Sequence, residues 1–278
     1  MHIRVIKKVK NDVFKIMLLE TGAQILTVPG FDDTGLVKTF FTSRKGGVST
    51  GAYASLNFGG RNDDASEKVS RNRESVFGAL GFDDPIAVFP EQVHEDKIAC
   101  VRRTDIVASR NMIFPDTDAV ITRERNIILT SMHADCIPVY LFDPINKVIG
   151  MVHAGWRGTK LAIGAKTAKK MVEDLGAEYA CIKAAIGPGI SICCFEVEQG
   201  TYDEFKETTE NIDEFTVKNP DGKYNIDLKA LNIAQLKAIG VNDIVVSDYC
   251  TVCESELFYS HRRENGVTGR MGAGIGLL

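Results

Sequence analysis

The segment Thr130–Thr159 constrains the fold of this chain more than any other. It contains two apolar runs, Ile137–Phe142 and Val148–Val152, which are joined by the turn-forming tetrapeptide Asp143–Asn146 (Asp-Pro-Ile-Asn). Two apolar runs of strand length that flank a short turn predict an antiparallel β-hairpin. We expect the rest of the chain to be arranged around this hairpin.

A thiol and an imidazole frame the predicted hairpin. Cys136 stands directly before the first apolar run, and His153 directly follows the second. In an antiparallel hairpin the entry of one strand lies beside the exit of the next, so the two side chains are predicted to be neighbours. The glycine-containing segment Gly155–Gly158 (Gly-Trp-Arg-Gly) follows at once. This combination indicates a reaction site rather than a core.

Composition excludes several classes of protein. The 278 residues are 44% hydrophobic and 25% charged, which is typical of a globular domain. The formal net charge of −4 gives no basic field, so we predict no nucleic-acid partner and no membrane partner. Met1–Lys8 lacks the apolar core of a signal peptide, and no apolar run is long enough to span a bilayer. The seven cysteines lack the spacing of a disulfide scaffold, so we predict a reduced, cytoplasmic protein.

Strand and helix patterns are interleaved irregularly along the chain, with several hairpins. Besides the central hairpin, strands are predicted at Met1–Lys8, Val13–Leu19, Gln24–Val28, Val37–Phe41, Ile86–Phe89, Lys97–Arg102, Asp118–Thr122, Asn126–Thr130, Cys181–Ile186, Ile244–Val246 and Leu257–His261. Helices are predicted from Asp64 (capping box with Glu67) to Gly81, over Thr159–Leu175, over Glu198–Lys206, and from Asp227. Polar Glu207–Lys223 is expected to be a long loop or insertion, and Gly269–Leu278 a glycine-rich tail. We find no linker, repeat or compositional break, so residues 1–278 are predicted to form one mixed α/β domain.

A third residue extends the thiol–imidazole pair to a possible metal site. His94, one of five histidines in the chain, follows a predicted strand and a short loop, much as His153 does. A catalytic zinc takes three protein ligands and leaves one position open for water or substrate. His94, Cys136 and His153 would form an open set of this kind.

Two other interpretations of these residues stay open. Cys136 and His153 could be the catalytic pair of a thiol hydrolase, with Asp135 and His133 in supporting roles. A His₂Cys set is also the equatorial set of blue copper, and Met132 is close enough in sequence to supply the weak axial ligand. A complete multicopper oxidase is excluded by counting, because its trinuclear cluster alone takes more histidines than the five present.

Two arginines suit an anionic ligand. Arg44 opens the segment Arg44–Gly47 (Arg-Lys-Gly-Gly), in which an arginine fork and glycine N–H groups could meet a phosphate, although the spacing is not that of a P-loop. The alternative for this segment is a solvated hairpin turn. Arg157 gives a second possible anion contact beside the metal site. Trp156, the only tryptophan, is expected to pack against the core.

The remaining cysteines give a weaker signal. Cys250 and Cys253 form a CxxC pair, but a zinc ribbon needs a second such pair. Cys193 and Cys194 are adjacent and poorly spaced for chelation. We therefore expect buried structural thiols at these positions. His261, followed by two arginines, either meets an acidic substrate or simply ends a surface strand.

Taken together, the motifs resemble the laccase-domain (YfiH/YlmD-like) family, whose members are named as polyphenol oxidases, purine nucleoside phosphorylases or peptidoglycan editing factors. The resemblance covers most of the chain. The motifs that carry it are Thr42-Ser43-Arg44, Gly46-Gly47-Val48-Ser49, Ser55-Leu56-Asn57, Gln92-Val93-His94, Ala134-Asp135-Cys136, His153-Ala154-Gly155-Trp156-Arg157-Gly158, Ile186-Gly187-Pro188 and Ser260-His261-Arg262-Arg263.

The resemblance implies a fold, a metal and an activity. The fold would be a layered α-β-β-α sandwich with mixed sheets, and the metal a single zinc, with copper as a second possibility, held by His94, Cys136 and His153. The activity would be phosphorolysis of adenosine, inosine and S-methyl-5′-thioadenosine, with adenosine deamination in addition. The partners would be purine nucleosides and phosphate, and the protein a monomer or homodimer. Two departures from the family pattern are His133 and the segment Glu198–Gly200.

Roles follow for the individual residues. Asp135, Cys136 and Arg44 are predicted to be catalytic, with Asp135 transferring a proton. Substrate binding is assigned to Arg44, Asn57, Arg157 and His261. The alternative functions are a Cys- or metal-dependent amide hydrolase that edits peptidoglycan precursors and a copper-dependent, laccase-like polyphenol oxidase.

Overall fold

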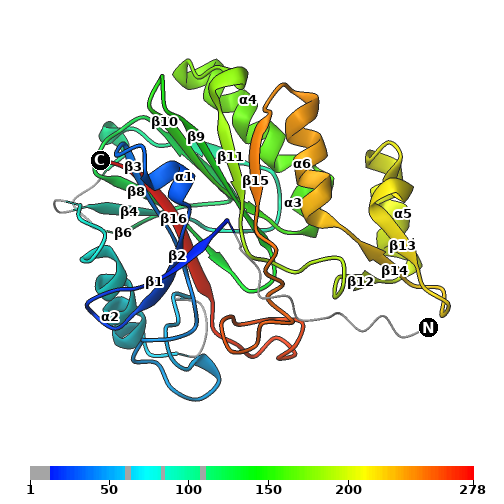
Figure 1. Ribbon diagram of the computed structural model, residues 1–278, viewed down its shortest axis with the longest axis horizontal. Coiled ribbons are helices and arrows are strands. Elements are labelled where there is room, and N and C mark those ends of the chain that lie inside the picture. The colour runs from blue at the N-terminus through cyan, green and yellow to red at the C-terminus, as the bar shows by residue number, and fades with distance from the viewer. Residues whose placement is uncertain (1–12, 60–63, 83–84, 107–110) are drawn as a thin grey trace.

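Two mixed β-sheets lie face to face in the body of the molecule (Figure 1). The computed structural model describes residues 13–59, 64–82, 85–106 and 111–278, so the predicted strand Met1–Lys8 lies outside the described residues. Within them, the larger sheet has seven strands, in the order β1 (Lys15–Leu18), β2 (Gln24–Thr27), β3 (Val37–Thr42), β16 (Met271–Leu277), β8 (Ile127–His133), β4 (Ile86–Pro90) and β6 (Asn111–Phe114).

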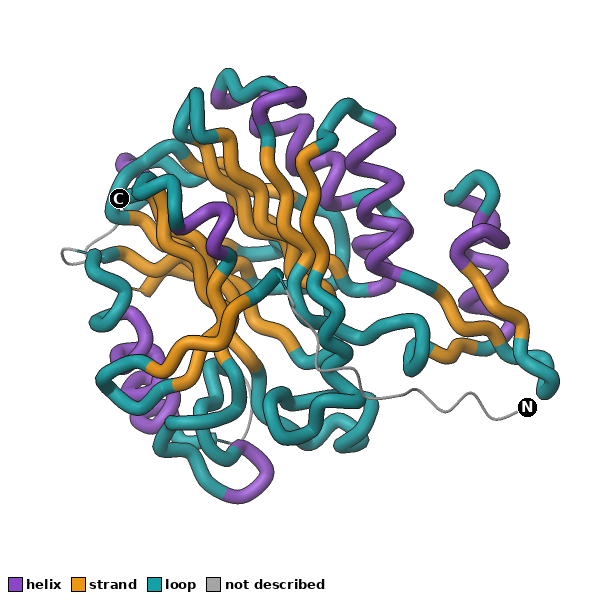
Figure 2. The backbone as a smooth tube through the Cα atoms, in the orientation of Figure 1, coloured by secondary structure: helices purple, strands orange, loops and turns teal. Residues whose placement is uncertain are grey.

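The second sheet and the helices complete the layers. The sheet has six described strands, in the order β15 (Asp243–Val246), β11 (Lys183–Ile186), β9 (Ile137–Asp143), β10 (Val148–Ala154), β7 (Ala119–Thr122) and β5 (Ile98–Cys100). A small sheet of β12 (Glu196–Val197), β14 (Tyr224–Ile226) and β13 (Thr216–Lys218) stands to one side with α5 (Gln199–Thr208) (Figure 2). The other α-helices of the described residues are α1 (Pro29–Asp32), α2 (Ser66–Phe77), α3 (Trp156–Lys160), α4 (Ile163–Leu175) and α6 (Leu228–Ala238).

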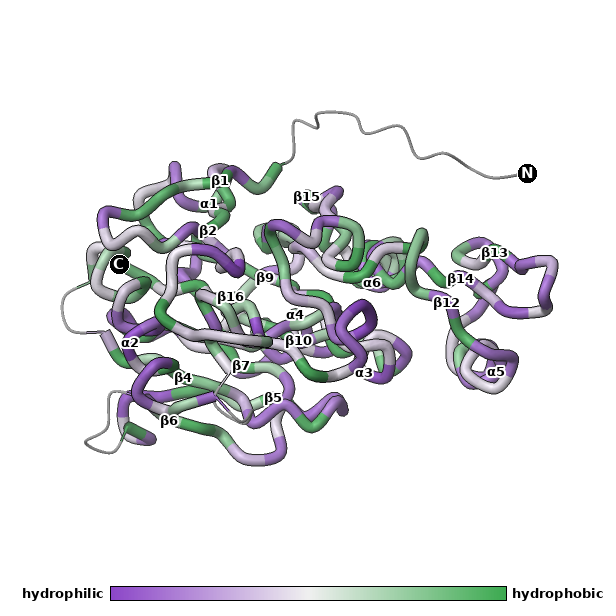
Figure 3. The backbone as a smooth tube through the Cα atoms, turned by 90° about the horizontal axis from the view of Figure 1, so that it is seen from below, coloured by the Kyte–Doolittle hydropathy of each residue, from purple (hydrophilic) through white to green (hydrophobic). Residues whose placement is uncertain are grey.

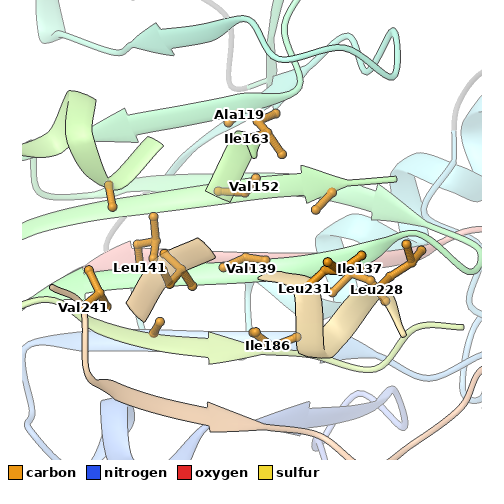
Figure 4. Packing of buried hydrophobic residues seen from close by; sticks show 14 of the residues in the cluster. Ala119, Ile137, Val139, Leu141, Val152, Ile163, Ile186, Leu228, Leu231 and Val241 are labelled. Atoms are coloured by element: carbon orange, nitrogen blue, oxygen red, sulfur yellow. The ribbon is translucent and has the colours of Figure 1, made fainter. Parts of the chain in front are cut away.

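Three apolar clusters define the order of the layers. The first lies between the sheets and joins residues such as Leu129 and Ile275 of the larger sheet to Tyr140 of the smaller one. The second lies on the outer face of the six-stranded sheet, where α4 and α6 bring side chains such as Ile163, Leu228 and Leu231 onto β9 and β10 (Figure 4). The third joins Val76 of α2 to the outer face of the seven-stranded sheet. The predicted α-β-β-α sandwich is therefore confirmed.

The central hairpin forms as predicted. β9 and β10 pair antiparallel from Val148 opposite Asp143 to Ala154 opposite Ile137, and every residue of both strands is buried. Burial on both faces explains why the two runs are almost continuously apolar, because neither face is exposed to water. Asp143 closes the turn, since its Oδ1 accepts hydrogen bonds of 2.9 Å from the N–H groups of Ile145 and Asn146.

The C-terminal segment is a central strand rather than a glycine-rich tail. β16 pairs with β3 on one side and β8 on the other. Three of its glycines lie under aromatic rings: a Cβ would lie 2.2 Å from Phe58 at Gly272, 2.3 Å from Phe40 at Gly274 and 2.6 Å from Phe82 at Gly276. Glycine usually weakens a strand, but here it leaves room for the rings. The glycine-rich composition of this segment therefore did not predict a strand.

Two other segments differ from expectation. Leu257–His261 is not a strand but an irregular loop between two turns, in which the adjacent residues Phe258 and Tyr259 are both buried. Adjacent buried aromatic residues give the same sequence pattern as a strand that is buried on both faces. The predicted helix Thr159–Leu175 is two helices, α3 and α4, because Ala162 takes a left-handed conformation with φ of 57°. An alanine at such a position gives no sequence signal.

Smaller corrections concern the helix starts and the polar segment. The capping box at Asp64 does not form, because its carboxylate accepts a hydrogen bond from Asn57 Nδ2, and α2 begins at Ser66. The cap at Asp227 is confirmed by a 3.0 Å hydrogen bond from the backbone of Ala230. Glu207–Lys223 is not a loop throughout, since it includes the end of α5 and β13. This region is coloured mainly hydrophilic in Figure 3.

That the whole chain forms one domain stays a prediction. Within the described residues, no helix combines the length and the apolar character needed to cross a bilayer.

Candidate metal centre

Three predicted ligands meet at the end of the central hairpin. One donor atom each from His94, Cys136 and His153 lies within 4.8 Å of the others. His153 is the penultimate residue of β10, opposite Pro138, and Cys136 directly precedes β9. The predicted neighbourhood of the thiol and the imidazole is therefore confirmed, and His94 joins them.

The backbone after β4 turns sharply to bring His94 to the hairpin. Gln92 and His94 both have positive φ, of 61° and 66°. The Gln92 side chain pairs with the backbone of Met132, accepting a hydrogen bond of 2.8 Å from its N–H and donating one of 2.7 Å to its carbonyl oxygen. This pairing fixes the loop against β8 and turns the His94 ring toward the other two ligands.

Asp118 positions two of the three ligands. Its Oδ1 accepts hydrogen bonds from His153 Nδ1 at 2.8 Å and from the His94 backbone at 2.9 Å. Its Oδ2 accepts from the N–H groups of Val93 and Glu95. Because Nδ1 of His153 donates to a carboxylate, Nε2 is left free to bind a metal. From the sequence, Asp118 is only the first residue of a predicted strand, because no local motif marks this role.

The three candidate ligands differ in their exposure to solvent. His153 is buried, Cys136 is partly buried and His94 is exposed. Gly155 lies directly beside them: an added Cβ would lie 3.1 Å from Cys136 Sγ and 3.3 Å from His94 Cδ2. A glycine here leaves space next to the donor atoms. Two imidazoles, one thiolate and an unobstructed side fit an open tetrahedral metal site.

Electrostatics favour the charged form of Cys136. Burial opposes ionisation, but the positive charge and hydrogen bonds of His153 and His94 outweigh it and lower the pKa of Cys136 to about 6. Burial likewise opposes the charge on His153, but the Cys136 thiolate and the hydrogen bond to Asp118 raise its pKa to about 9. A thiolate is the form that both binds metals and acts as a nucleophile.

The ligands open into a pocket of about 670 Å³. Its lining includes Asp135, Arg157 and His261 from the predicted site, together with Arg262 and Arg270, which were not assigned. Neither Arg44 nor Asn57 is among the lining residues. The structure therefore brings most, but not all, of the predicted site residues together.

Arg44 is occupied by contacts within the protein. Its guanidinium forms an ion pair of 3.0 Å with Glu264, donates to the carbonyl oxygen of Ser255 and lies over the ring of Tyr259 at 4.7 Å. These contacts fasten the loop after β3 to the C-terminal loops. Its predicted catalytic and substrate-binding roles stay predictions.

Asn57 lies behind the pocket wall. It is fully buried, and its Oδ1 accepts hydrogen bonds from the backbone N–H groups of Gly59 and Arg270. The Arg270 side chain donates to the carbonyl oxygens of Thr268 and Gly269 and faces the pocket. Asn57 thus positions a lining arginine, which the sequence analysis missed because it sits in a segment expected to be a tail.

Asp135 anchors the wall of the pocket. Its φ is 90°, its Oδ1 accepts a hydrogen bond of 2.6 Å from Thr251, and its Oδ2 accepts bonds from Ser260 Oγ and the Arg262 backbone. These bonds hold the loops at 251 and 260–262 against the start of the hairpin. Proton transfer by Asp135 stays a prediction.

His133 is not part of the donor set. It is buried, and burial lowers the pKa of its imidazole well below the usual value. Nδ1 lies 3.0 Å from the carbonyl oxygen of Cys136, which accepts only, so Nδ1 carries the proton. Nε2 lies 2.7 Å from Ser131 Oγ and accepts from it. The ring therefore supports the backbone that carries the Cys136 thiol.

Trp156 and Arg157 close one side of the pocket. Trp156 packs against the core cluster beneath α4 and α6, as expected. The guanidinium of Arg157 lies over its ring at 4.5 Å and is exposed. Met132, proposed above as an axial copper ligand, also lines the pocket, but its sulfur lies 3.8 Å from Arg73 Nη2.

Known proteins share this sequence and fold. Residues 38–278 match the family model described as multi-copper polyphenol oxidoreductase laccase. A Bacillus subtilis protein named purine nucleoside phosphorylase YlmD is 35% identical over 242 residues, which cover 85% of this chain and 87% of that protein. A protein from an unknown prokaryotic organism, named adenosine deaminase RL5, is 35% identical over 249 residues, covering 86% and 93%.

A solved structure agrees with these relatives. The crystal structure of YlmD from Geobacillus stearothermophilus superimposes with a TM-score of 0.87 at 34% identity, covering 96% of this chain and 99% of that one. Sequence and fold agree, and the chain belongs to the laccase-like family that includes the YlmD and YfiH proteins.

Proposed function

We propose that this chain is a zinc-dependent purine nucleoside phosphorylase that acts on adenosine, inosine and S-methyl-5′-thioadenosine and also deaminates adenosine. One observation carries the proposal: the set His94–Cys136–His153 opens into a pocket that is also lined by arginines. Two relatives, one named a purine nucleoside phosphorylase and the other an adenosine deaminase, support both activities.

The ligand set suits zinc. A thiolate with two imidazoles gives one soft and two borderline donors, a mixture that zinc accepts in three-ligand catalytic sites. When bound, zinc supplies Lewis acidity and lowers the pKa of a water molecule. The protein keeps His153 in the required tautomer through Asp118 and keeps the adjacent space open through Gly155.

The arginines suit phosphate. Arg157 is exposed at the pocket, and among the described residues no carboxylate forms an ion pair with it. A guanidinium fork matches two phosphate oxygens and stabilises charge that develops during transfer. Arg262 and Arg270 line the same pocket, each held by hydrogen bonds to backbone carbonyl oxygens. We assign phosphate binding to Arg157, with Arg270 as the second cation.

His261 and Asp135 serve the nucleoside. His261 lines the pocket and is exposed, and we assign it to hydrogen bonding with the sugar or the base. Asp135 keeps the His261 loop in place through Ser260 and Arg262 and reaches the pocket from the hairpin end. We assign proton transfer in the reaction to Asp135.

The test is an assay of adenosine with inorganic phosphate. The protein is expected to release adenine and ribose 1-phosphate, and in the absence of phosphate to form inosine. Cys136→Ala should abolish both reactions and lower the bound zinc. Cys181→Ala, at a cysteine outside the pocket, is the matched control and should change neither. Full activity of the Cys136→Ala variant contradicts the proposal.

The lowered pKa of Cys136 beside His153 also favours a second candidate, a thiol-dependent amide hydrolase acting on peptidoglycan precursors. That enzyme would form a covalent adduct at Cys136 with an amide substrate analogue and would stay active after chelation. Activity that is lost on chelation and restored by zinc rejects it. Turnover of a phenol panel only after copper loading would instead support a laccase-like oxidase.

A further inference from the structure

Four cysteines from segments distant from the hairpin in the sequence converge in space. Their Sγ atoms all lie within 4.8 Å of one another, although they come from two segments about sixty residues apart: Cys193 and Cys194, Cys250 and Cys253. The expectation of buried structural thiols is wrong for Cys193 and Cys253, which are exposed. Contrary to expectation, Cys193 and Cys194 are also not too poorly spaced to bind one ion, because a turn at 192–194 brings their sulfurs to 3.6 Å from one another.

Three of the six distances between the sulfurs match the edges of one face of a tetrahedron, and the Cys250 sulfur lies within 4.8 Å of the other three. Cys193 Sγ lies 3.6 Å from Cys194 Sγ and 3.7 Å from Cys253 Sγ, and Cys194 Sγ lies 3.5 Å from Cys253 Sγ. A tetrahedral zinc site with Zn–S bonds of about 2.3 Å has sulfur–sulfur edges of roughly 3.8 Å. A disulfide would need about 2.05 Å, and the described cysteines are all free thiols.

A backbone hydrogen bond holds the CxxC segment of the cluster in a turn. The CxxC turn itself closes with a hydrogen bond of 3.0 Å from Glu254 N–H to the Cys250 carbonyl oxygen.

We propose that Cys193, Cys194, Cys250 and Cys253 bind one zinc ion in a second, closed site, separate from the set at the hairpin. Each thiol gives up its proton to solvent as the metal binds, and no oxidation or reduction takes place. Four protein ligands leave no position for water or substrate, so this zinc is structural.

The second site ties together two loops that form the pocket wall. Phe195 follows the Cys193–Cys194 turn, and Arg262 follows the CxxC turn; both residues line the pocket. Arg262 Nη1 donates hydrogen bonds to the carbonyl oxygens of Cys194 and Glu196. These bonds join the two loops. Because the cysteines join the same loops, the zinc holds this part of the wall in place.

The experiment counts metal in the full-length chain in the absence of nucleoside, so it does not depend on the proposed activity. Cys136→Ala removes the thiolate of the first site. Purified without chelator, this variant should keep about one zinc per chain. After exchange with cobalt it should show the intense visible absorption of tetrahedral four-thiolate coordination. In the Cys136→Ala background, Cys193→Ser and Cys253→Ser should each abolish that absorption, whereas Cys100→Ser, at a cysteine outside the cluster, should not.

A second measurement uses the wild-type protein, so it does not depend on variants that fold poorly. Removal of metal from the wild type by chelation should increase proteolytic cleavage in 190–195 and 250–262 and leave the hairpin resistant. Two results overturn the proposal. One is a Cys136→Ala protein with no four-thiolate cobalt spectrum and four freely titrating thiols in the cluster. The other is a disulfide found by mass spectrometry between any two of the four cysteines in protein purified without oxidant.

Discussion

Asp118 and His153 are joined by a hydrogen bond of 2.8 Å between Oδ1 and Nδ1, and both side chains are buried. The same carboxylate accepts three backbone N–H groups from residues 93–95. One side chain from the start of β7 therefore sets the tautomer of one ligand and the loop conformation of another.

Asp118→Asn should weaken metal binding. The amide keeps one acceptor oxygen but places an NH₂ group against N–H donors of the His94 loop, so the ligands lose their orientation. Loss of an outer hydrogen bond of this kind costs roughly 10–100-fold in metal affinity. Competition with a chromogenic chelator measures the change. Asp116→Asn, at an exposed carboxylate two residues away, should bind zinc as the wild type does.

Gly155→Ala should disturb the same site by crowding. Gly155 has a φ of −67°, which alanine adopts readily, so the fold should be kept. The added methyl would lie 3.1 Å from Cys136 Sγ and push against the donor atoms. We expect lower zinc content with an unchanged circular dichroism spectrum. Gly200→Ala, where the added Cβ meets nothing within 4 Å, is the control, and equal zinc content in both variants would refute the crowding argument.

Arg157→Ala should raise the KM for phosphate about tenfold, which corresponds to about 1.4 kcal/mol of lost binding. The KM for adenosine should change less, because the guanidinium is assigned to the anion. Arg157→Lys keeps the charge but not the fork, so its KM for phosphate should lie between those of the wild type and Arg157→Ala. Steady-state kinetics with each substrate varied in turn gives both values. An unchanged phosphate KM in Arg157→Ala would remove this residue from the proposed phosphate site.

Asp143→Asn should destabilise the hairpin at neutral pH. Asp143 is buried at the turn; burial raises its pKa, but hydrogen bonds from Asn146, Glu178 and Ile145 outweigh this and lower it below 3.8. The variant leaves donors unpaired, at a cost of ~1–3 kcal/mol.

The pH dependence of this cost follows from the lowered pKa. The carboxylate stabilises the fold above its unfolded pKa, and that contribution disappears as the pH falls through the lower folded pKa. The difference in unfolding free energy between wild type and Asp143→Asn should therefore be full at pH 7 and shrink below about pH 4. Urea titrations across this range measure it, with Asp33→Asn, at an exposed carboxylate, as the control. A difference that stays constant to pH 3 would contradict the assignment.

Gly274→Ala should destabilise the larger sheet. The new Cβ would overlap the Phe40 ring at 2.3 Å in a fully buried strand, and overpacking of this kind costs ~1–3 kcal/mol. Thermal unfolding should show a lower midpoint. Adding Phe40→Leu, which removes the clashing ring, should recover part of the loss. A double variant no more stable than Gly274→Ala alone would show that the ring is not the obstacle.

Local patterns in the sequence determined the central hairpin, the cap at Asp227, the α-β-β-α class through family resemblance, and the neighbourhood of Cys136 and His153. These features depend on contacts between residues close in the chain, or on motifs long enough to be specific. A strand–turn–strand pattern brings its own ends together, so the pair at its mouth can be inferred without knowing the rest of the fold.

Only the tertiary structure decided the remainder, because it depends on contacts between distant segments. Asp118 reaches His153 across paired strands, Asn57 positions Arg270 more than two hundred residues away, and the glycines of β16 are explained only by the rings above them. The four cysteines give the clearest case. Neither pair is a convincing metal site alone, and only the packing of the loops after β11 and β15 places all four sulfurs within 4.8 Å of one another.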